Sequence, residues 1–328
     1  MVENKIKNIY IHMTRKCNLK CSYCYFNAGD NSDADHTVNT ELSFEEFNGL
    51  FKDIAALSPE KLVFTGGEPL LRDDIYPIAA AFRSIDASRR TRLCLMSNGT
   101  LIDENQAFQI AKHFDEIRIS VDGLPYTNDR LRGEGVFSKA ERAIRLLNLA
   151  GISPGISVTL TSENSGKLEA FMEYAVDNMH VNQFHFSPFR PVGRGFNRND
   201  LLCSWTYAQS VIFRFWEKRY GFIHVKKDAE SYMLKTCGSC GIGCYINILQ
   251  DGSVYPCHVL STPEFLIGNI RQQSLSDILN AESVLKKLES LDLKEIYKKY
   301  PQIESLYTDA VCLGELLINS CESLKKLL

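Results

Sequence analysis

Short runs of apolar and β-branched residues alternate with amphipathic segments over roughly the first two hundred positions of the chain. An apolar run followed by apolar side chains at every third or fourth position is typical of a parallel strand and its covering helix. Six such runs have the bounds Ile6–Met13, Lys61–Thr65, Arg92–Ser97, Glu116–Val121, Ile156–Leu160 and Gln183–Ser187. Six strand–helix units predict an α/β fold whose sheet forms an incomplete barrel.

The first long helix is predicted to begin at Ser43. Ser43 and Glu46 have the spacing of a capping box, in which each side chain bonds to the backbone N–H of the other residue. After about residue 190 the alternation stops, and an aromatic-rich helix is expected around Trp205–Tyr220. We therefore divide the chain into a domain of residues 1–200 and a C-terminal extension of residues 201–328.

The extension contains a strong turn signal at Asp251-Gly252. A two-residue Asp-Gly turn between apolar runs predicts a β-hairpin, here joining Tyr245–Leu249 to Val254–Tyr255. From Ser274 onward the sequence is rich in Lys, Glu and Leu and predicts helices. The extension should therefore be a small unit of one hairpin plus helices.

Composition limits the class of protein. Hydrophobic residues make up 45% of the chain, charged residues 23%, and the net charge is −3, as in ordinary globular proteins. This balance gives no electrostatic reason to expect a nucleic-acid or membrane partner. Met1–Asn8 lacks the apolar stretch of a signal peptide, and no apolar run approaches the length of a membrane span. We therefore expect a cytoplasmic protein.

Eleven cysteines are many for a reducing compartment, where clustered thiols more often bind metal than form disulfides. Seven of them form two groups, which are Cys17, Cys21 and Cys24, and then Cys237, Cys240, Cys244 and Cys257. The four scattered cysteines are expected to be small buried hydrophobic residues.

The first group directly follows the first predicted strand, at the edge where α/β barrels keep their active sites. Three thiolates can bind a four-iron cluster and leave one iron open to a ligand. A zinc site is the alternative, but zinc usually needs a fourth nearby ligand. His12 lies inside the strand and His36 is distant, so the spacing favours the cluster.

Cys-x3-Cys-x-aromatic-Cys after an N-terminal strand resembles the signature of the radical S-adenosylmethionine (SAM) superfamily. The second strand ends in Gly66, Gly67, Glu68 and Pro69, which looks like the GGEP motif of that family. The resemblance implies that this segment holds the amino group of SAM. The residue types suit that role, because glycines allow close approach of the backbone and a carboxylate complements an ammonium.

Later strand ends resemble further SAM contacts of the family. Asn98 follows the third strand, and Ser120 and Asp122 match a segment associated with the ribose hydroxyls. Such residues are also common caps and turn formers. Arg190 or Arg194 is expected to meet the SAM carboxylate, unless it is a surface arginine. Weaker possibilities are Thr159, Thr161 and Asn164.

The resemblance implies a fold and a reaction. The fold is a partial (β/α)6 TIM-like barrel with a small cysteine-rich extension of a hairpin plus helices. The cofactors are SAM and a SAM-binding [4Fe-4S] cluster, with a reducing partner such as flavodoxin or ferredoxin. Reductive cleavage of SAM would give a 5′-deoxyadenosyl radical that abstracts a substrate hydrogen.

The second group supplies four thiols around the hairpin, enough for a zinc ion or an iron–sulfur cluster. The segment from Cys240 to Cys257 resembles the SPASM and twitch extensions of radical SAM enzymes, which bind auxiliary clusters. Here no further run of closely spaced cysteines follows, so we expect one auxiliary [4Fe-4S] cluster. Its predicted ligands are Cys237, Cys240, Cys244 and Cys257, with Cys312 or Cys321 as alternatives.

Family members with such extensions mostly modify ribosomally made peptides. Formation of a crosslink, a thioether or a related bond in a peptide is therefore the leading prediction. A dehydrogenase or epimerase that acts on a small molecule is the nearest alternative. A non-catalytic scaffold or electron carrier is a third, which the GGEP-like segment argues against because such a protein does not need to bind SAM.

Overall fold

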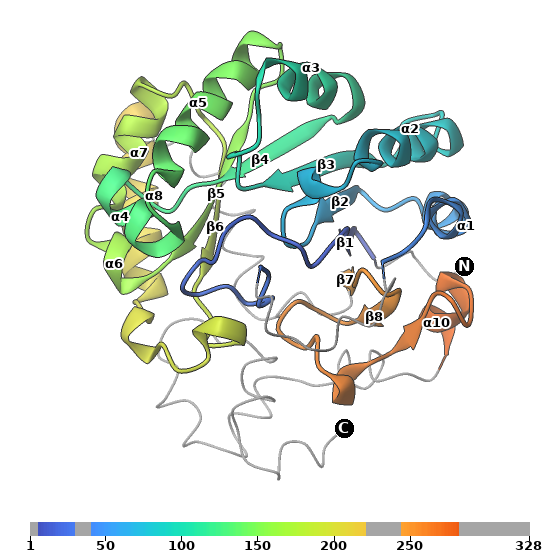
Figure 1. Ribbon diagram of the computed structural model, residues 1–328. Helices are drawn as coiled ribbons and strands as arrows, with labels where there is room; N and C mark the ends of the chain where they lie inside the picture. Colours follow the sequence, from blue (N-terminus) through green and yellow to red (C-terminus); the bar gives the residue numbers. More distant parts are fainter. Residues whose placement is uncertain (1–5, 30–40, 221–243, 282–328) are drawn as a thin grey trace.

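The computed structural model of the chain describes residues 6–29, 41–220 and 244–281 (Figure 1). Its strands form one open sheet in the order β6-β5-β4-β3-β2-β1-β7-β8-β9, and β1 to β7 all pair in parallel. Their bounds are β1 Asn8–His12, β2 Lys61–Thr65, β3 Arg92–Ser97, β4 Glu116–Ser120, β5 Gly155–Leu160, β6 Phe184–Pro188, β7 Tyr245–Ile248, β8 Ser253–Tyr255 and β9 Gly268–Asn269.

Helices cover the convex side of this sheet (Figure 1). The α-helices are α1 Phe44–Leu57, α2 Ile75–Ile85, α3 Glu104–His113, α4 Pro125–Arg132, α5 Val136–Leu149, α6 Ser162–Ser165, α7 Leu168–Asp177, α8 Trp205–Tyr220 and α10 Leu275–Asn280. Four short 3-10 helices are η1 Pro69–Leu71, η2 Gly193–Gly195, η3 Asn199–Leu201 and η4 Pro263–Phe265. The predicted α/β fold with a partial barrel is confirmed, because the sheet is parallel over most of its width and is not closed.

The alternation of side chains along β1 separates the core from the concave face. Ile9 and Ile11 are completely buried and pack with the hydrophobic core beneath the helices. Side chains two residues apart share a face of a strand, so Tyr10 and His12 point to the opposite, concave side. The predicted start of α1 is also confirmed, because the capping box between Ser43 and Glu46 is formed in both directions.

The C-terminal hairpin continues the barrel sheet. β7 lies parallel to β1, with Asn8 opposite Tyr245, and β8 folds back antiparallel to β7. Gly252 in the turn has a φ of +84°, a conformation that favours glycine. The division of the chain near residue 200 stays a prediction. In the described parts of the chain, no helix is long and apolar enough to span a bilayer.

Element boundaries differ from the sequence prediction by one or two residues. β1 is shorter than Ile6–Met13, β6 is shifted by one residue from Gln183–Ser187, and β8 begins at Ser253. Strand ends are defined by pairing, which an apolar pattern does not specify.

Candidate SAM and cluster site

The first cysteine group lies on the loop that leaves the C-terminal end of β1. Cys17, Cys21 and Cys24 are all partly buried, and a turn brings the backbone N–H of Cys24 to the carbonyl oxygen of Cys21 at 3.2 Å. Burial raises the pKa of Cys17 to about 11 and also raises that of Cys21. These thiols are therefore protonated until a metal displaces the protons, as metal binding to cysteine requires.

In the described residues, no three Cys, His, Asp or Glu side chains are close enough to share one metal ion. This result does not conflict with a four-iron cluster, which binds each thiolate on a different iron atom. The donor set of three partly buried thiols on one loop fits such a cluster.

The Gly66-Gly67 segment at the end of β2 presses against the chain that leads into the cysteine loop. A Cβ on Gly67 would lie 2.1 Å from the carbonyl oxygen of Lys16, and Gly66 has a φ of +132°. The backbone N–H groups of Gly67 and Glu68 each donate at 2.8 Å to this chain, to Thr14 and Lys16. Only glycine allows this contact, which places Glu68 beside the base of the loop.

Glu68 is a fully buried carboxylate with hydrogen bonds but no ion pair among the described residues. It accepts hydrogen bonds from the Ser97 hydroxyl at 2.9 Å, the Asn98 N–H at 2.8 Å and the Leu70 N–H at 3.2 Å. Burial raises its pKa to about 7, and these donors only partly offset that effect. A buried carboxylate without a cation is suited to receive one from a ligand.

The Asn98 side chain forms hydrogen bonds with other residues of the protein. Its side-chain NH₂ donates at 2.9 Å to the side-chain oxygen of Asn18, one residue after Cys17. Its own side-chain oxygen accepts from the Thr100 N–H at 2.9 Å and from the Thr100 hydroxyl at 2.6 Å. Asn98 therefore ties the end of β3 to the cysteine loop.

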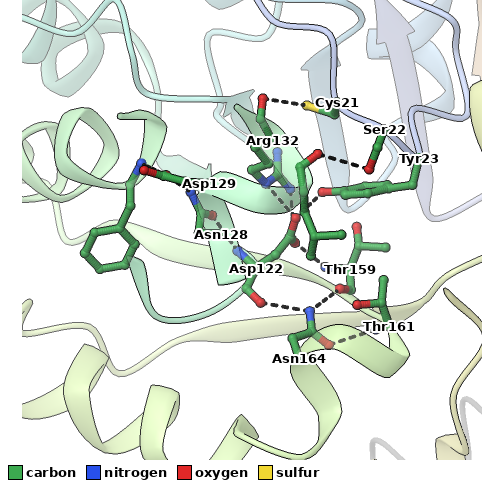
Figure 2. Close-up of polar contacts among 12 residues, drawn as sticks. Cys21, Ser22, Tyr23, Asp122, Asn128, Asp129, Arg132, Thr159, Thr161 and Asn164 are labelled. Carbon is green, nitrogen blue, oxygen red and sulfur yellow. Dashed lines mark hydrogen bonds and ion pairs between the residues drawn. The ribbon is translucent and has the colours of Figure 1, made fainter. Parts of the chain in front are cut away.

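Asp122, two residues beyond β4, is also fully buried, and its carboxylate is surrounded by partners (Figure 2). Arg132 makes a two-pronged contact with it, with nitrogen–oxygen distances of 2.7 and 3.1 Å. The Thr159 N–H donates at 2.8 Å, and the Tyr23 hydroxyl donates to the second oxygen. The predicted ribose contact of Asp122 stays a prediction, and these bonds favour a structural role.

The other predicted residues near Asp122 also have internal partners. The Asn164 side chain donates to the backbone carbonyls of Asp122 and Thr159 at 2.8 and 2.7 Å, and it accepts from the Thr161 N–H (Figure 2). Ser120 lies at the end of β4 and is partly buried. These side chains shape the strand ends around Asp122.

Arg190 and Arg194 follow β6 and are placed differently. Arg190 is partly buried beyond the strand end. The Arg194 guanidinium donates at 2.8 Å to the carbonyl oxygens of Cys21 and Ala28, and the Arg194 N–H donates at 2.9 Å to that of Cys24. Arg194 therefore holds the cysteine loop from the β6 side.

The stretch of chain that contains the three-cysteine loop, the glycine pair and Glu68 matches a known protein family. The model of the radical SAM superfamily matches residues 11–175, half of the chain. The chain belongs to the radical SAM superfamily. A second model, described as an iron–sulfur cluster-binding domain and named SPASM, matches residues 237–304.

Relatives of this radical SAM enzyme have different products. It is 29% identical to pre-heme d1 synthase of Dinoroseobacter shibae over 81% of this chain and 71% of the relative. It is 26% identical to PqqA peptide cyclase of Granulibacter bethesdensis over 85% and 75% of the two chains. The solved structure of anSMEcpe with bound AdoMet has the same fold, with a TM-score of 0.69 at 21% identity. The match covers 84% of this chain and 81% of that chain.

The family uses SAM and a [4Fe-4S] cluster, and its SPASM domain binds auxiliary iron–sulfur clusters. Two of the four predicted auxiliary ligands of this radical SAM enzyme are described. Cys244 is exposed just before β7, and its carbonyl oxygen accepts from the N–H groups of Lys7 and Asn8. Cys257 is buried after β8, and its sulfur accepts from the Leu260 N–H at 3.3 Å. Cys237, Cys240, Cys312 and Cys321 lie outside the described residues.

Sequence reasoning missed the residues that hold the cysteine loop from outside. Tyr23 is the aromatic residue of the cysteine motif and Arg132 is the last residue of α4, and the sequence pattern predicts no contact for either. The Leu131 carbonyl accepts from both the N–H and the hydroxyl of Ser22, at 3.0 and 3.3 Å. The available signal was the charged Arg132 between apolar Leu131 and a glycine. Its partner, Asp122, is ten positions away along the chain, so the local pattern does not indicate the pair.

Proposed function

We propose that this radical SAM enzyme cleaves SAM at a cluster held by Cys17, Cys21 and Cys24 and directs the resulting radical at a ribosomally made peptide. The observation that carries the first half is Glu68. It is a fully buried carboxylate with neutral donors on both oxygens and no ion pair among the described residues, beside the cysteine loop. The methionine ammonium of SAM would supply the missing positive charge.

The protein's own residues bind and orient the cofactors. Ser97, Asn98 and Leu70 fix the orientation of the Glu68 carboxylate, so that it needs little rearrangement on accepting an ammonium. Gly66 and Gly67 let the backbone approach closely. When bound, the cluster and SAM supply the one-electron chemistry that generates a hydrogen-abstracting radical, and a flavodoxin or ferredoxin would supply the electron.

The first test removes the loop thiols. The holoenzyme is reconstituted anaerobically as wild type, as the triple Cys17, Cys21, Cys24→Ala variant, and as Cys94→Ala. Cys94 is a buried strand cysteine of the same chain and serves as the matched control. With dithionite and SAM, wild type and control should form 5′-deoxyadenosine and the triple variant should not. Product formation by the triple variant would refute the assignment.

The concave wall beside β1 is compatible with a peptide substrate. On this wall the rings of Tyr10, Tyr25 and Tyr245 all contact the His258 ring, and the rings of Tyr10 and Tyr245 contact each other. The distances between ring centroids are 4.6–6.2 Å. This wall presents uncharged aromatic groups, which suit peptide side chains and amides. The likeness to PqqA peptide cyclase supports the same choice.

A tetrapyrrole is the second candidate substrate, since the chain is similar to pre-heme d1 synthase over 81% of its length. The two candidates are separated by mass spectrometry after incubation with SAM and reductant. A mass change on a short peptide encoded beside the gene supports the first proposal. Modification of an iron porphyrin side chain, without any change to the peptide, would refute the peptide proposal and support a tetrapyrrole substrate.

We also propose that the extension 201–328 holds the auxiliary cluster through Cys237, Cys240, Cys244 and Cys257. The buried thiol of Cys257, which already accepts a hydrogen bond, supports this assignment. Iron and sulfide analysis of reconstituted protein should give about eight irons per chain, as two four-iron clusters require. About four irons with one zinc would exclude an auxiliary iron–sulfur cluster.

A further inference from the structure

The segment that follows β6 is pressed against the cysteine loop. Gly193 has a φ of +60°, and a Cβ at this position would lie 2.3 Å from the backbone oxygen of Tyr25. A side chain here would collide with the backbone of the loop, so the contact requires glycine. The segment therefore meets the loop backbone to backbone, directly after Cys24.

Arg194, the next residue, binds the loop at three points. One guanidinium nitrogen donates at 2.8 Å to the carbonyl oxygen of Cys21, and the other terminal nitrogen donates at 2.8 Å to that of Ala28. The backbone N–H of Arg194 donates at 2.9 Å to the carbonyl oxygen of Cys24. Since Cys21 and Ala28 lie on either side of Cys24, the guanidinium links the two halves of the loop.

These bonds suit a residue that shapes the loop. Residues 17–29 contain no helix or strand, so regular secondary structure supplies no partners for their carbonyl oxygens. A guanidinium holds its N–H groups in one rigid plane and can bridge two acceptors, which the ammonium of a lysine cannot do in the same geometry. All three bonds end on backbone oxygens, so they leave the thiols of the loop available to bind iron.

The charge of Arg194 is a second feature of this contact. A guanidinium in a protein stays protonated, and here it is one hydrogen bond away from the backbone of Cys21. A cluster gains negative charge when it is reduced, and cluster potentials respond to nearby charge and hydrogen bonding. A fixed cation beside the loop would therefore favour the reduced form.

We propose that Arg194 is a positioning residue for the SAM-binding cluster, because its contacts fix the loop in the shape that accepts the cluster and its charge favours reduction. This inference rests on the proposed ligand role of Cys17, Cys21 and Cys24. The step that it favours is the transfer of one electron from the reducing partner to the cluster, in which no bond forms or breaks. Arg194 acts in this step through the loop backbone and does not touch SAM.

The shape of the loop is tested by hydrogen exchange in the full chain before reconstitution, followed by mass spectrometry of peptides that cover residues 17–29. Arg194→Lys and Arg194→Gln should both speed exchange of these amides about tenfold, as expected for loss of a hydrogen bond from a charged donor. The control is Arg198→Gln, because Arg198 pairs with Asp200 on the exposed surface and should exchange like wild type. Equal exchange in all four proteins would overturn the inference.

The charge is tested by redox titration of the reconstituted holoenzyme without SAM. The titration follows the electron paramagnetic resonance signal that the triple Cys17, Cys21, Cys24→Ala variant lacks. Arg194→Gln should lower the equilibrium constant for reduction roughly tenfold, which is a shift of about 59 mV to lower potential. Arg194→Lys keeps the charge and should titrate close to wild type, whereas a purely structural role would shift both variants alike. Equal potentials in wild type and Arg194→Gln would refute the role of the charge.

The inference and the proposed function can fail separately. If the triple cysteine variant keeps every signal of wild type, the loop binds no cluster and the proposed function fails. If that variant loses a signal, but Arg194→Gln weakens SAM binding and has the loop exchange and potential of wild type, Arg194 contacts SAM and only the inference is wrong. Should Arg194→Gln take up no cluster, the exchange measurement needs none and still decides the inference.

Discussion

Glu68 and Asp122 follow two strands of the same sheet, and both carboxylates are fully buried, but within the described part of the chain only Asp122 has a cation beside it. Arg132 binds both oxygens of Asp122, and Tyr23 and Thr159 donate further hydrogen bonds to this carboxylate. The donors that Glu68 receives from the residues that the structure describes are all neutral, and burial raises its pKa to about 7. The comparison shows two states of a buried carboxylate. One whose charge is already paired needs no further partner, and one whose charge is unpaired can bind a cationic ligand.

From this difference we predict opposite roles for the two acids. Asp122 joins α4, β5 and the cysteine loop, so its removal should harm folding more than ligand binding. Glu68 is held by its donors and has no ion pair with any residue in ranges 6–29, 41–220 and 244–281, so its removal should harm ligand binding more than folding. Each prediction below would break or sharpen that contrast.

The largest effect is expected for Asp122→Ala, which leaves the buried Arg132 guanidinium without its partner. Breaking one side of a buried ion pair costs about 3–5 kcal/mol of unfolding free energy. Chemical denaturation of the metal-free protein measures it. The control is Asp200→Ala, because Asp200 pairs with Arg198 on the exposed surface, where a pair is worth about 0–1 kcal/mol.

Similar losses in the two variants would mean that the Asp122 pair contributes no more than a surface pair. If Asp122→Ala folds normally but no longer binds SAM, the result would support the ribose role predicted from the sequence.

Glu68→Gln should have a smaller effect of the opposite kind. Loss of the charged partner should weaken SAM binding by about 2–5 kcal/mol, as for a buried hydrogen-bonded charge pair. The unfolding free energy should change by roughly 1 kcal/mol, because the amide keeps the size and part of the hydrogen bonding. Calorimetric titration of reconstituted protein with SAM measures the binding. Unchanged affinity would remove Glu68 from the SAM site.

The smallest effect is a pH dependence of SAM binding. Glu68 must be ionised to hold an ammonium, and its pKa without ligand is about 7. Between pH 6 and pH 8 the ionised fraction, and with it the affinity for SAM, should rise about tenfold and then level off. Glu68→Gln should flatten this part of the profile. A profile of equal slope in wild type and variant would assign the titration to another group.

The same pKa has a consequence for folding with a definite sign. The ordinary pKa of a glutamate is 4.5, so the raised value in the folded protein favours the protonated form. The contribution of Glu68 to stability is therefore fully present below about pH 4.5 and is lost as the pH rises through about 7. SAM binding would offset this loss by pairing the charge.

The sequence alone determined the cofactor chemistry and most of the architecture. Cys17, Cys21, Cys24 and the segment from Gly66 to Pro69 are local motifs, because each depends on neighbouring residues of one loop. The strands and the capping box at Ser43 were also readable, since side-chain periodicity and caps act within a few residues. These features need no knowledge of the tertiary structure.

Only the tertiary structure decided which polar residues are already paired. Asp122, Asn98 and Arg194 carry the residue types of ligand contacts, and each already has hydrogen-bond partners within the chain, while its contact with SAM stays a prediction. Some of their partners come from distant positions of the chain, such as Asn18 for Asn98 and Cys21 for Arg194. Hydrogen bonding and burial depend on what lies opposite in space, and the sequence pattern of one segment contains no record of that.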